Sequence, residues 1–255
     1  MTKWPDFISI VIPGYNEEKR VAQSLKALSL FCKDHFERYE IVFVNDGSTD
    51  KSGEIVESLA IPFLRAIHLR INQGKGHAVK TGMLEARGEY RFFTDADLPY
   101  ASEAFLQAIN LFHSTPCDWI AGARDLPESS DPSGQTLFRK LTSKGFSALV
   151  RLLLKVDVKD TQCGFKGFTA SAADKIFSLS SVKGYAFDVE LFLLAQAGHL
   201  KIGKIPVRLI ERRHSKVRLT LDAPQMFWDV VKMYGRHRAH GARCKEKPLL
   251  PPARK

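Results

Sequence analysis

The chain has 255 residues, 44% of them hydrophobic, and its 38 lysines and arginines against 28 acidic residues give a formal net charge of +10. This size is sufficient for one large α/β domain with a full core. The positive balance favours an anionic partner, which could be a nucleotide, a phospholipid surface or a nucleic acid. Four scattered cysteines without paired zinc spacing exclude a disulfide-rich scaffold and indicate a reducing compartment.

No stretch of the sequence approaches the roughly 18 consecutive apolar residues that a membrane-spanning helix needs. The opening residues, MTKWPD, also lack the basic and apolar regions of a signal peptide. We therefore expect a cytoplasmic protein that is soluble or bound peripherally to the cytoplasmic membrane face.

The first half of the chain alternates between predicted strands and predicted helices. Short apolar runs predict strands over residues 7–13, 40–45, 63–69, 90–94 and 118–121. Helical periodicity predicts helices over residues 17–33, 76–86 and 102–113. We also expect Ser48 or Thr49 to cap a helix and Gly88 to end one. This alternation predicts a mostly parallel sheet covered on both faces, with ligands bound at the carboxyl ends of its strands.

The composition and pattern of the sequence change after Arg124. A loop rich in proline, serine and glycine is followed by a basic amphipathic helix over residues 138–155. Further elements are predicted as a short strand within 160–169, an apolar helix over 187–197, a strand over 201–210, a charged loop over 211–218 and a helix over 222–236. The basic tail from residue 237 is expected to be disordered.

Two carboxylates, Asp95 and Asp97, stand one residue apart where the predicted strand 90–94 ends. Residues at i and i+2 of a strand point to the same side, so both carboxylates can face one point. Two adjacent anions need a compensating cation, and Mg²⁺ typically takes one or two carboxylates plus substrate phosphates. The pair predicts a metal–diphosphate site. Asp-x-Asp alone is more typical of a turn, and the neighbouring motifs are what favour the site.

Polar groups also follow the first two predicted strands. After Pro13, which ends the first strand, Tyr15 offers a ring for stacking on a base and Glu17 offers an acceptor for base or ribose. After the second strand, Asp46 can accept from a uracil N–H or a ribose hydroxyl. Turn formation and helix capping are the alternative roles for both segments.

Taken together, IPGYNE at 12–17, VNDGSTD at 44–50 and DAD at 95–97 resemble the ordered signature of the inverting glycosyltransferases of family 2. The resemblance covers about residues 7–220. It implies that a nucleotide is held by Pro13, Tyr15, Glu17 and Asp46. It further implies that Asp95 and Asp97 hold the diphosphate and a divalent metal, Mg²⁺ or Mn²⁺.

The fold that this resemblance implies is GT-A, an α/β fold with a Rossmann-like, mostly parallel sheet. We expect one domain over residues 1–236, with a nucleotide-binding half at about 7–124 and an acceptor half at about 125–236. The basic tail at 237–255 would lie outside this domain.

Two further cationic groups could face the donor. The segment NQGKG at 72–76 matches a family segment near the nucleotide, where glycines let the backbone approach the ligand and Lys75 supplies a positive charge. Arg124 could bind a phosphate of donor or acceptor with its planar fork. The alternatives are a flexible turn with a solvated lysine, and a surface salt bridge.

In the second half, DTQCGFK at 160–166 and FDVEL at 187–191 resemble the group that contains the dolichyl-phosphate β-glucosyltransferases and the dolichyl-phosphate mannose synthases. Members of this group move one sugar from a nucleotide-sugar onto a polyprenyl phosphate. The sequence of the DTQCGFK motif favours UDP-glucose as donor. A Gln that helps to bind the metal in mannose synthases is replaced here by Leu98-Pro99, which weakens the mannose alternative.

We assign the acceptor phosphate to a later basic segment, in which Ser215-Lys216 resembles the acceptor loop of this group and the arginines add positive charge. The residues concerned are Arg212, Arg213, Ser215 and Lys216. A phosphate acceptor is already anionic and needs no strong base, whereas a sugar hydroxyl needs one, and Asp188 is the candidate. A helix start, where carboxylates favour the dipole, is the alternative role of Asp188.

Several alternatives remain open at this stage. The chain could act on a hydroxyl of a soluble or polysaccharide acceptor, or be a nucleotidyltransferase. Charge alone suggests nucleic-acid binding, but no recognised motif supports it, so we expect no nucleic-acid partner. Eukaryotic members of the glucosyltransferase group carry a membrane helix, so membrane contact would come here from the basic amphipathic surface or from a membrane protein partner.

Overall fold

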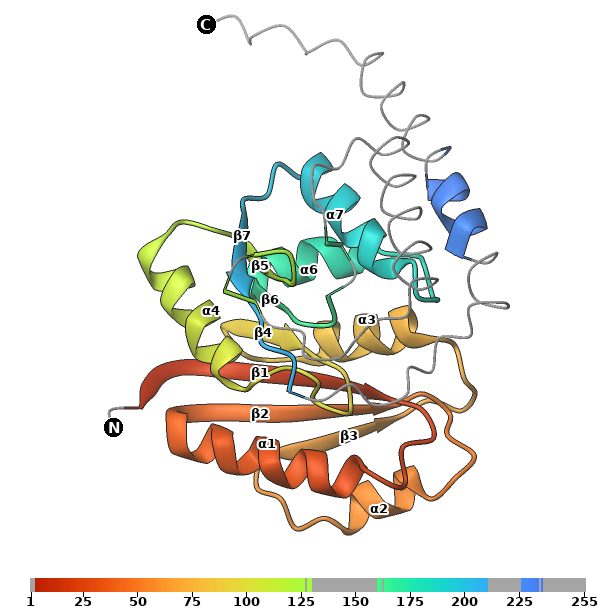
Figure 1. Cartoon of the computed structure of the whole chain (residues 1–255). Coiled ribbons are helices and arrows are strands. Elements are labelled where there is room, and N and C mark those ends of the chain that lie inside the picture. The colour runs from red at the N-terminus through yellow and green to blue at the C-terminus, as the bar shows by residue number, and fades with distance from the viewer. Residues whose placement is uncertain are drawn as a thin grey trace, which may run out of the picture.

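A computed structural model describes residues 3–126, 128–129, 160–161, 163–210, 226–233 and 235. Its centre is a seven-stranded sheet with the order β3-β2-β1-β4-β6-β5-β7 (Figure 1). The strands are β1 (Trp4–Gly14), β2 (Phe36–Asn45), β3 (Leu64–His68), β4 (Tyr90–Phe93), β5 (Trp119–Ala123), β6 (Lys166–Thr169) and β7 (Ile202–Pro206). Every pairing is parallel except those of β6, which runs antiparallel to both β4 and β5.

Helices cover both faces of this sheet (Figure 1). They are α1 (Val21–His35), α2 (Ser52–Ser58), α3 (Lys75–Glu85), α4 (Glu103–Ser114), α6 (Ala170–Leu179) and α7 (Phe187–Ala197), with a further helical segment at 226–233. The core on one face includes α1, α2 and α4, and the core on the other includes α3, α6, α7 and residues from 226–233. The mostly parallel α/β arrangement expected from the sequence is confirmed.

Strand β1 shows why the sequence produces this layering. Its residues Ile8, Ile10 and Ile12 pack into one core and Val11 packs into the other, as the twofold side-chain alternation of a strand requires. A strand that is apolar on both sides is buried on both sides, which is typical of parallel sheets. The carboxyl ends of β1, β2 and β4 therefore meet at one edge between the helical layers.

The predicted elements were found with small shifts in their ends, and α7 has the predicted bounds. The helix cap predicted at Ser48 or Thr49 is wrong, because α2 begins at Ser52 and the Asp50 carboxylate accepts its N–H at 2.9 Å. The helix end predicted at Gly88 is also wrong, because Ala86 already adopts an extended conformation. Gly88 instead packs against β1, where a Cβ would lie 2.7 Å from the Phe7 carbonyl oxygen.

Helix α6 was not predicted, and the antiparallel direction of β6 was not predicted either. The Thr169 hydroxyl caps α6 by accepting from the Ala172 N–H at 3.3 Å. The described part of the helix predicted over 222–236 is helical at 226–233. The helix predicted over 138–155, the loop at 211–218 and the tail from 237 lie outside the described residues. Across the part of the chain that the structure describes, no helix combines the length and the apolar character needed to cross a membrane.

Candidate active site

Lys75 and Asp95 form the centre of the site. Lys75 is the first residue of α3 and Asp95 follows β4, and the Lys75 ammonium forms an ion pair with Asp95 Oδ1. Burial lowers the pKa of Lys75, but the carboxylates of Asp95 and Asp188 outweigh it and hold that pKa above its ordinary value. The pair therefore keeps a permanent cation beside a carboxylate at the edge of the sheet.

The Asp95 carboxylate is packed against the backbone of Gly164. A Cβ at Gly164 would lie 2.3 Å from Asp95 Oδ2, so only a glycine leaves the carboxylate in its place. The N–H of Gly164 points to the Tyr100 hydroxyl at 3.4 Å. The segment that precedes β6 thus forms one wall of the site.

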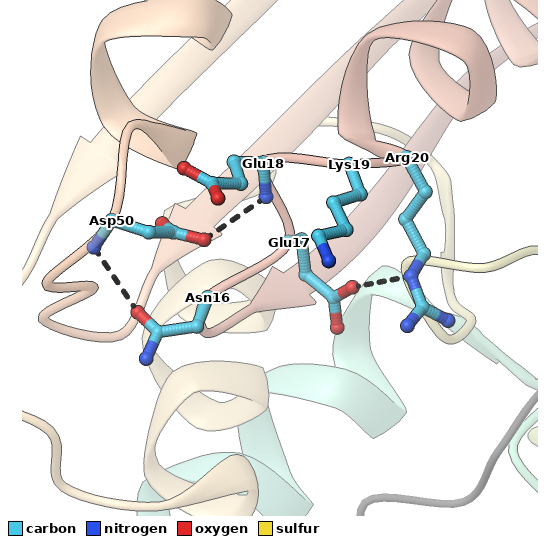
Figure 2. A pocket seen from close by; sticks show the side chains of 6 residues that line it. All are labelled: Asn16, Glu17, Glu18, Lys19, Arg20 and Asp50. Atoms are coloured by element: carbon cyan, nitrogen blue, oxygen red, sulfur yellow. Dashed lines mark hydrogen bonds and ion pairs between the residues drawn. The ribbon is translucent and has the colours of Figure 1, made fainter.

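Asp97 lies two residues further on and is accompanied by Arg20, which precedes α1. Arg20 Nη1 lies 3.8 Å from Asp97 Oδ2, and Arg20 Nε lies 3.0 Å from Glu17 Oε2 (Figure 2). Burial, followed by the nearby Asp95, raises the pKa of Asp97. The two carboxylates of the Asp-x-Asp pair therefore act on each other electrostatically. They lie in a turn after β4, where the Leu98 N–H donates to the Asp95 carbonyl at 2.9 Å, so the strand alternation that was expected to align them does not apply.

A pocket of about 290 Å³ adjoins this group, beside the start of α1. Its lining residues, drawn in Figure 2, are Asn16, Glu17, Glu18, Lys19, Arg20 and Asp50. Asn16 joins the ends of β1 and β2, because its N–H donates to Ser48 Oγ at 2.9 Å and its side-chain oxygen accepts from the Thr49 N–H at 2.8 Å. In the same segment Pro13 is buried and Tyr15 is 37% exposed.

Asp46 makes hydrogen bonds to a loop, and the sequence did not predict them. Its two carboxylate oxygens accept from the N–H groups of Gln73 at 2.8 Å and Gly74 at 2.9 Å. The Asn72 side-chain amide also donates to the Asp46 carbonyl oxygen at 3.2 Å. Asp46 is only 2% exposed, so in this structure it holds the loop that leads into α3 and carries Lys75.

The glycines of this loop also help to fix its position, because they allow close backbone contacts. At Gly74, where φ is +96°, a Cβ would lie 2.6 Å from the Lys183 carbonyl oxygen, and at Gly76 it would lie 2.4 Å from that of Val182. The Gly76 N–H donates to the Lys183 carbonyl at 2.7 Å. These glycines therefore let the loop approach the backbone of residues 182–183 closely.

Asp188 lies in the first turn of α7, a helix that covers the same face of the sheet as α3. It is 5% exposed, and its Oδ1 lies 2.5 Å from the ammonium of Lys166, which is fully buried. Burial raises the pKa of Asp188, and the positive charges of Lys166 and then Lys75 oppose that rise. Glu190, two residues further along α7, accepts from the N–H groups of Ser181 and Val182 at 2.9 and 2.8 Å.

Arg124, after β5, forms a two-pronged pair with Asp160. Its Nε and Nη2 each lie 2.7 Å from a carboxylate oxygen, and its backbone N–H also donates at 3.1 Å. Burial raises the pKa of Asp160, but the hydrogen bonds and charge of Arg124 outweigh it and lower the pKa below its ordinary value. Arg124 is one-third exposed, so one side of its fork can still face a ligand.

The structure thus places Lys75, Asp95, Asp97 and Asp188 around one edge of the sheet. Sequence reasoning missed the roles of Arg20 and Lys166. A basic residue within an apolar, aromatic strand was the available signal for Lys166. The predicted acceptor residues Arg212, Arg213, Ser215 and Lys216 lie outside the described residues. No group of three or more His, Cys, Asp and Glu side chains that could hold a metal ion occurs in the described ranges.

Solved structures share this architecture. Mannosyl-3-phosphoglycerate synthase from Rubrobacter xylanophilus superposes with a TM-score of 0.70 at 18% identity, covering 98% of this chain and 79% of its own. Glucosyl-3-phosphoglycerate synthase from Mycobacterium tuberculosis, crystallised with UDP, gives a TM-score of 0.66 at 16% identity, covering 91% and 80% of the two chains. The fold is therefore the GT-A fold.

Sequence comparison adds the family. The profile of glycosyl transferase family 2 matches residues 9–177. The dolichyl-phosphate β-glucosyltransferase of Dictyostelium discoideum is 31% identical over 91% of this chain and 75% of its own length. The enzymes of the same name from Saccharomyces cerevisiae and Homo sapiens are 33% and 35% identical, covering 88% and 82% of this chain and 73% and 69% of their own lengths. The chain belongs to glycosyl transferase family 2 and is a glycosyltransferase.

Proposed function

We propose that this chain transfers a single glucose from UDP-glucose to a polyprenyl phosphate of the dolichyl type, with inversion at the anomeric carbon. The observation that carries the proposal is the 31–35% identity to enzymes named dolichyl-phosphate β-glucosyltransferase. The arrangement of Lys75, Asp95 and Asp97 at the sheet edge supports it, because it suits a sugar nucleotide's diphosphate.

For the donor, we assign the base and ribose to the segment after β1 and the diphosphate to the segment after β4. Tyr15, which is 37% exposed, is assigned to base stacking and Glu17 to accepting a hydrogen bond, while Pro13 lies buried near the end of β1 just before them. Asp46 contributes by fixing the loop that carries Lys75, since both of its oxygens already accept backbone N–H groups of that loop.

The residues present fit a divalent metal at Asp95 and Asp97. The backbone of Gly164 confines the Asp95 carboxylate. The negative charge of Asp95 helps to raise the pKa of Asp97, and a bound cation would relieve this repulsion. Glucosyl-3-phosphoglycerate synthase from Mycobacterium tuberculosis, a structural neighbour, was crystallised with UDP together with Mn²⁺ in one structure and Mg²⁺ in another. With Asp95 and Asp97 as protein ligands, substrate phosphates and water would complete the coordination, as is usual for Mg²⁺. The bound ion would neutralise charge that develops on the departing diphosphate.

The chemical step is a displacement at the anomeric carbon. An oxygen of the acceptor phosphate forms the new bond from the face opposite the nucleotide, and the bond from that carbon to the β-phosphate oxygen breaks with its electron pair leaving on UDP. The ammonium of Lys75, and the guanidinium of Arg124, supply fixed positive charge toward the two phosphates. An ionised phosphate acceptor has no proton to give up, so no base is required for this reaction.

Acceptor binding is assigned to Ser215 and Lys216 on the family resemblance and to Arg212 and Arg213 as nearby positive charges. Their charges would pair with the acceptor phosphate, for which arginine is well suited. Because the acceptor is a lipid, the enzyme would work peripherally at the cytoplasmic face of a membrane, alone or with a membrane protein that supplies an anchor. The positive net charge of +10 suits an anionic bilayer surface.

The experiment measures transfer of labelled sugar from UDP-glucose, with GDP-mannose in parallel, to a polyprenyl phosphate in detergent with Mg²⁺ or Mn²⁺. We expect glycolipid from UDP-glucose that is lost with EDTA and in the Asp97→Asn variant, whereas Asp34→Asn, at an exposed site on α1, remains active. Glycolipid from GDP-mannose alone would contradict the donor. Bound UDP without any glycolipid would move the acceptor to a sugar hydroxyl, with Asp188 as its base.

A further inference from the structure

Lys166 occupies an unusual position for a lysine. It lies on β6 opposite Phe93 of β4 and Ala121 of β5, and the core that contains both of these residues lies beneath α3, α6 and α7. Directly opposed residues of antiparallel strands share a face, so the Lys166 side chain enters that same core. It has no exposed surface. Burial of a charge is costly unless the charge is paired, so this lysine must be held by specific partners.

The partners of its ammonium are well defined. Lys166 Nζ lies 2.5 Å from Asp188 Oδ1 and donates to the Cys163 carbonyl at 2.7 Å. The rings of Phe93 and Phe192 have their centroids 5.5 and 5.9 Å from the same nitrogen. Two acceptors and two ring faces fix the ammonium in one place. The carboxylate of Asp188 is consequently fixed as well.

Asp188 connects this buried lysine to the site. Its negative charge acts on the Lys75 ammonium, which also pairs with Asp95. Lys75 Nζ lies 5.9 Å from the ring centroid of Phe187, the residue before Asp188, so α7 and α3 approach each other here. Positive and negative groups thus alternate from the core to the edge, in the order Lys166, Asp188, Lys75 and Asp95.

We propose that Lys166 is a positioning residue for donor binding, which holds Asp188 as a fixed anion so that Asp188 in turn keeps the Lys75 ammonium at the diphosphate site. The inference rests on the proposed function, because that assigns Lys75 to the donor diphosphate. In this arrangement Asp188 orients Lys75 and accepts no proton from the acceptor.

Stability alone gives a weaker account of the pair. Replacing both members of a buried ion pair with uncharged residues is often neutral for stability, whereas removing one member strands the other charge. A pair that served only folding would therefore be dispensable when both members are exchanged together. A pair that positions Lys75 would still be needed for donor binding.

The test uses the full chain as Lys166→Met, Asp188→Asn and the double variant, with Lys175→Met as a matched control. Lys175 is exposed on α6, where its ammonium donates to the Gly198 carbonyl at 3.0 Å. UDP affinity with Mn²⁺ would be measured by calorimetry below the unfolding midpoint of every variant, alongside donor KM and kcat. The double variant keeps the test valid if Lys166→Met does not fold, since it strands neither charge.

We expect each single variant to weaken UDP binding about tenfold, the lower end of losses seen when groups supporting a site are removed. The double variant should bind no better than the singles while regaining thermal stability, since the residues act as one unit. Lys175→Met should bind as the wild type does. Donor KM should rise in parallel with the UDP dissociation constant.

Two results would overturn the inference. A double variant that binds UDP with wild-type affinity would show that the pair serves folding only. An Asp188→Asn protein with unchanged UDP affinity and a large loss of kcat would make Asp188 the proton acceptor. Failure of the wild type to bind UDP is a different result, visible before any variant is made: it would refute the proposed donor and, with it, the role given to Lys75.

Discussion

At the scale of single residues, contacts with neighbouring side chains and backbone groups fix the positions of the side chains in the site. Asp95 is held by Gly164 and Lys75, and Arg20 bridges Glu17 and Asp97. Apart from the local pair of Arg20 and Glu17, these contacts join segments distant in the sequence. A small change at a supporting residue should therefore alter donor binding without touching the donor.

Gly164→Ala is the sharpest change of this kind. The new Cβ would overlap Asp95 Oδ2, and the short aspartate side chain can only turn away. We expect affinity for UDP with Mn²⁺ to fall about tenfold, as measured by calorimetry. Gly235→Ala, where a Cβ would meet nothing within 4 Å, is the matched control and should bind normally. Equal affinity in the two variants would show that Asp95 is not confined as described.

The pair of Arg124 and Asp160 has a consequence for pH. Since the folded-state pKa of Asp160 is lowered, its contribution to stability is present above the unfolded pKa of about 4 and is lost as the pH falls through the folded value. Asp160→Asn should lower the free energy of unfolding by about 1–2 kcal/mol near neutral pH.

Urea unfolding from pH 7 down to pH 3 would measure this. The difference between wild type and Asp160→Asn should stay constant to about pH 5 and shrink below about pH 4. Asp34→Asn, at an exposed position on α1, should show no such trend. A difference that grows toward acid pH would mean that the pKa shift has the opposite sign.

Much of the site could be predicted at this scale, but not the partners within it. A carboxylate after an apolar strand signals the edge of a parallel sheet, which is how Asp46 and Asp95 were found. The sequence does not show which donors a carboxylate will meet. Asp46 was expected to contact the nucleotide, and the structure adds that its oxygens accept backbone N–H groups of residues 73–74.

At the scale of elements, the site depends on how α3 meets the segment before α7. The glycines at the start of α3 let it contact the carbonyls of Val182 and Lys183, and Glu190 holds the other side of that segment. This contact fixes where Lys75 emerges. Helix α3 is thus anchored by protein groups on both sides of its first turn.

Gly76→Ala tests this anchoring. Its Cβ would lie 2.4 Å from the Val182 carbonyl oxygen and 2.7 Å from Phe187 Cβ, both of which are firmly held. We expect a loss of about 1–3 kcal/mol in the free energy of unfolding, together with weaker UDP binding as Lys75 shifts. Thermal unfolding and calorimetry would measure the two effects.

Gly235→Ala again provides the control, and it should keep wild-type binding and stability or gain slightly, since alanine favours helix. Wild-type UDP affinity in a destabilised Gly76→Ala protein would contradict the link between this contact and Lys75. The measurement therefore separates packing of the element from its role in the site.

Elements with strong local patterns were predicted, and those defined by distant partners were not. Short apolar runs identified the strands, and the run over 187–197 identified α7 with the observed ends. The reversed direction of β6 depends on its insertion between β4 and β5, which no local pattern encodes. Helix α6 is an exception, because its apolar face, formed by Ala172, Ala173, Ile176 and Phe177, is a clear local signal that the sequence analysis missed.

At the scale of the whole molecule, the sheet joins the two expected halves of the chain. Strand β6, from the second half, lies between β4 and β5 of the first, and β7 pairs with β5. The wall that holds Asp95 also comes from the second half. We propose that the two halves form one folding unit.

A fragment of residues 1–124 tests this unit. It would leave β5 without both of its neighbouring strands and would remove the parts of the core contributed by α6 and α7. We expect no cooperative urea transition from the fragment, and a single transition from the full chain. A cooperative transition in the fragment would show that the nucleotide-binding half folds by itself.

The central claim concerns the product, so the most direct measurement is the structure of that product. The full chain would be incubated with ¹³C-labelled UDP-glucose, dolichyl phosphate and Mn²⁺, and the lipid fraction examined by ¹³C and ³¹P NMR. The account predicts one glucose per lipid, joined through a phosphodiester in the β configuration. A glucose joined to a hydroxyl, an α-linked product, or only free glucose and UDP would contradict it.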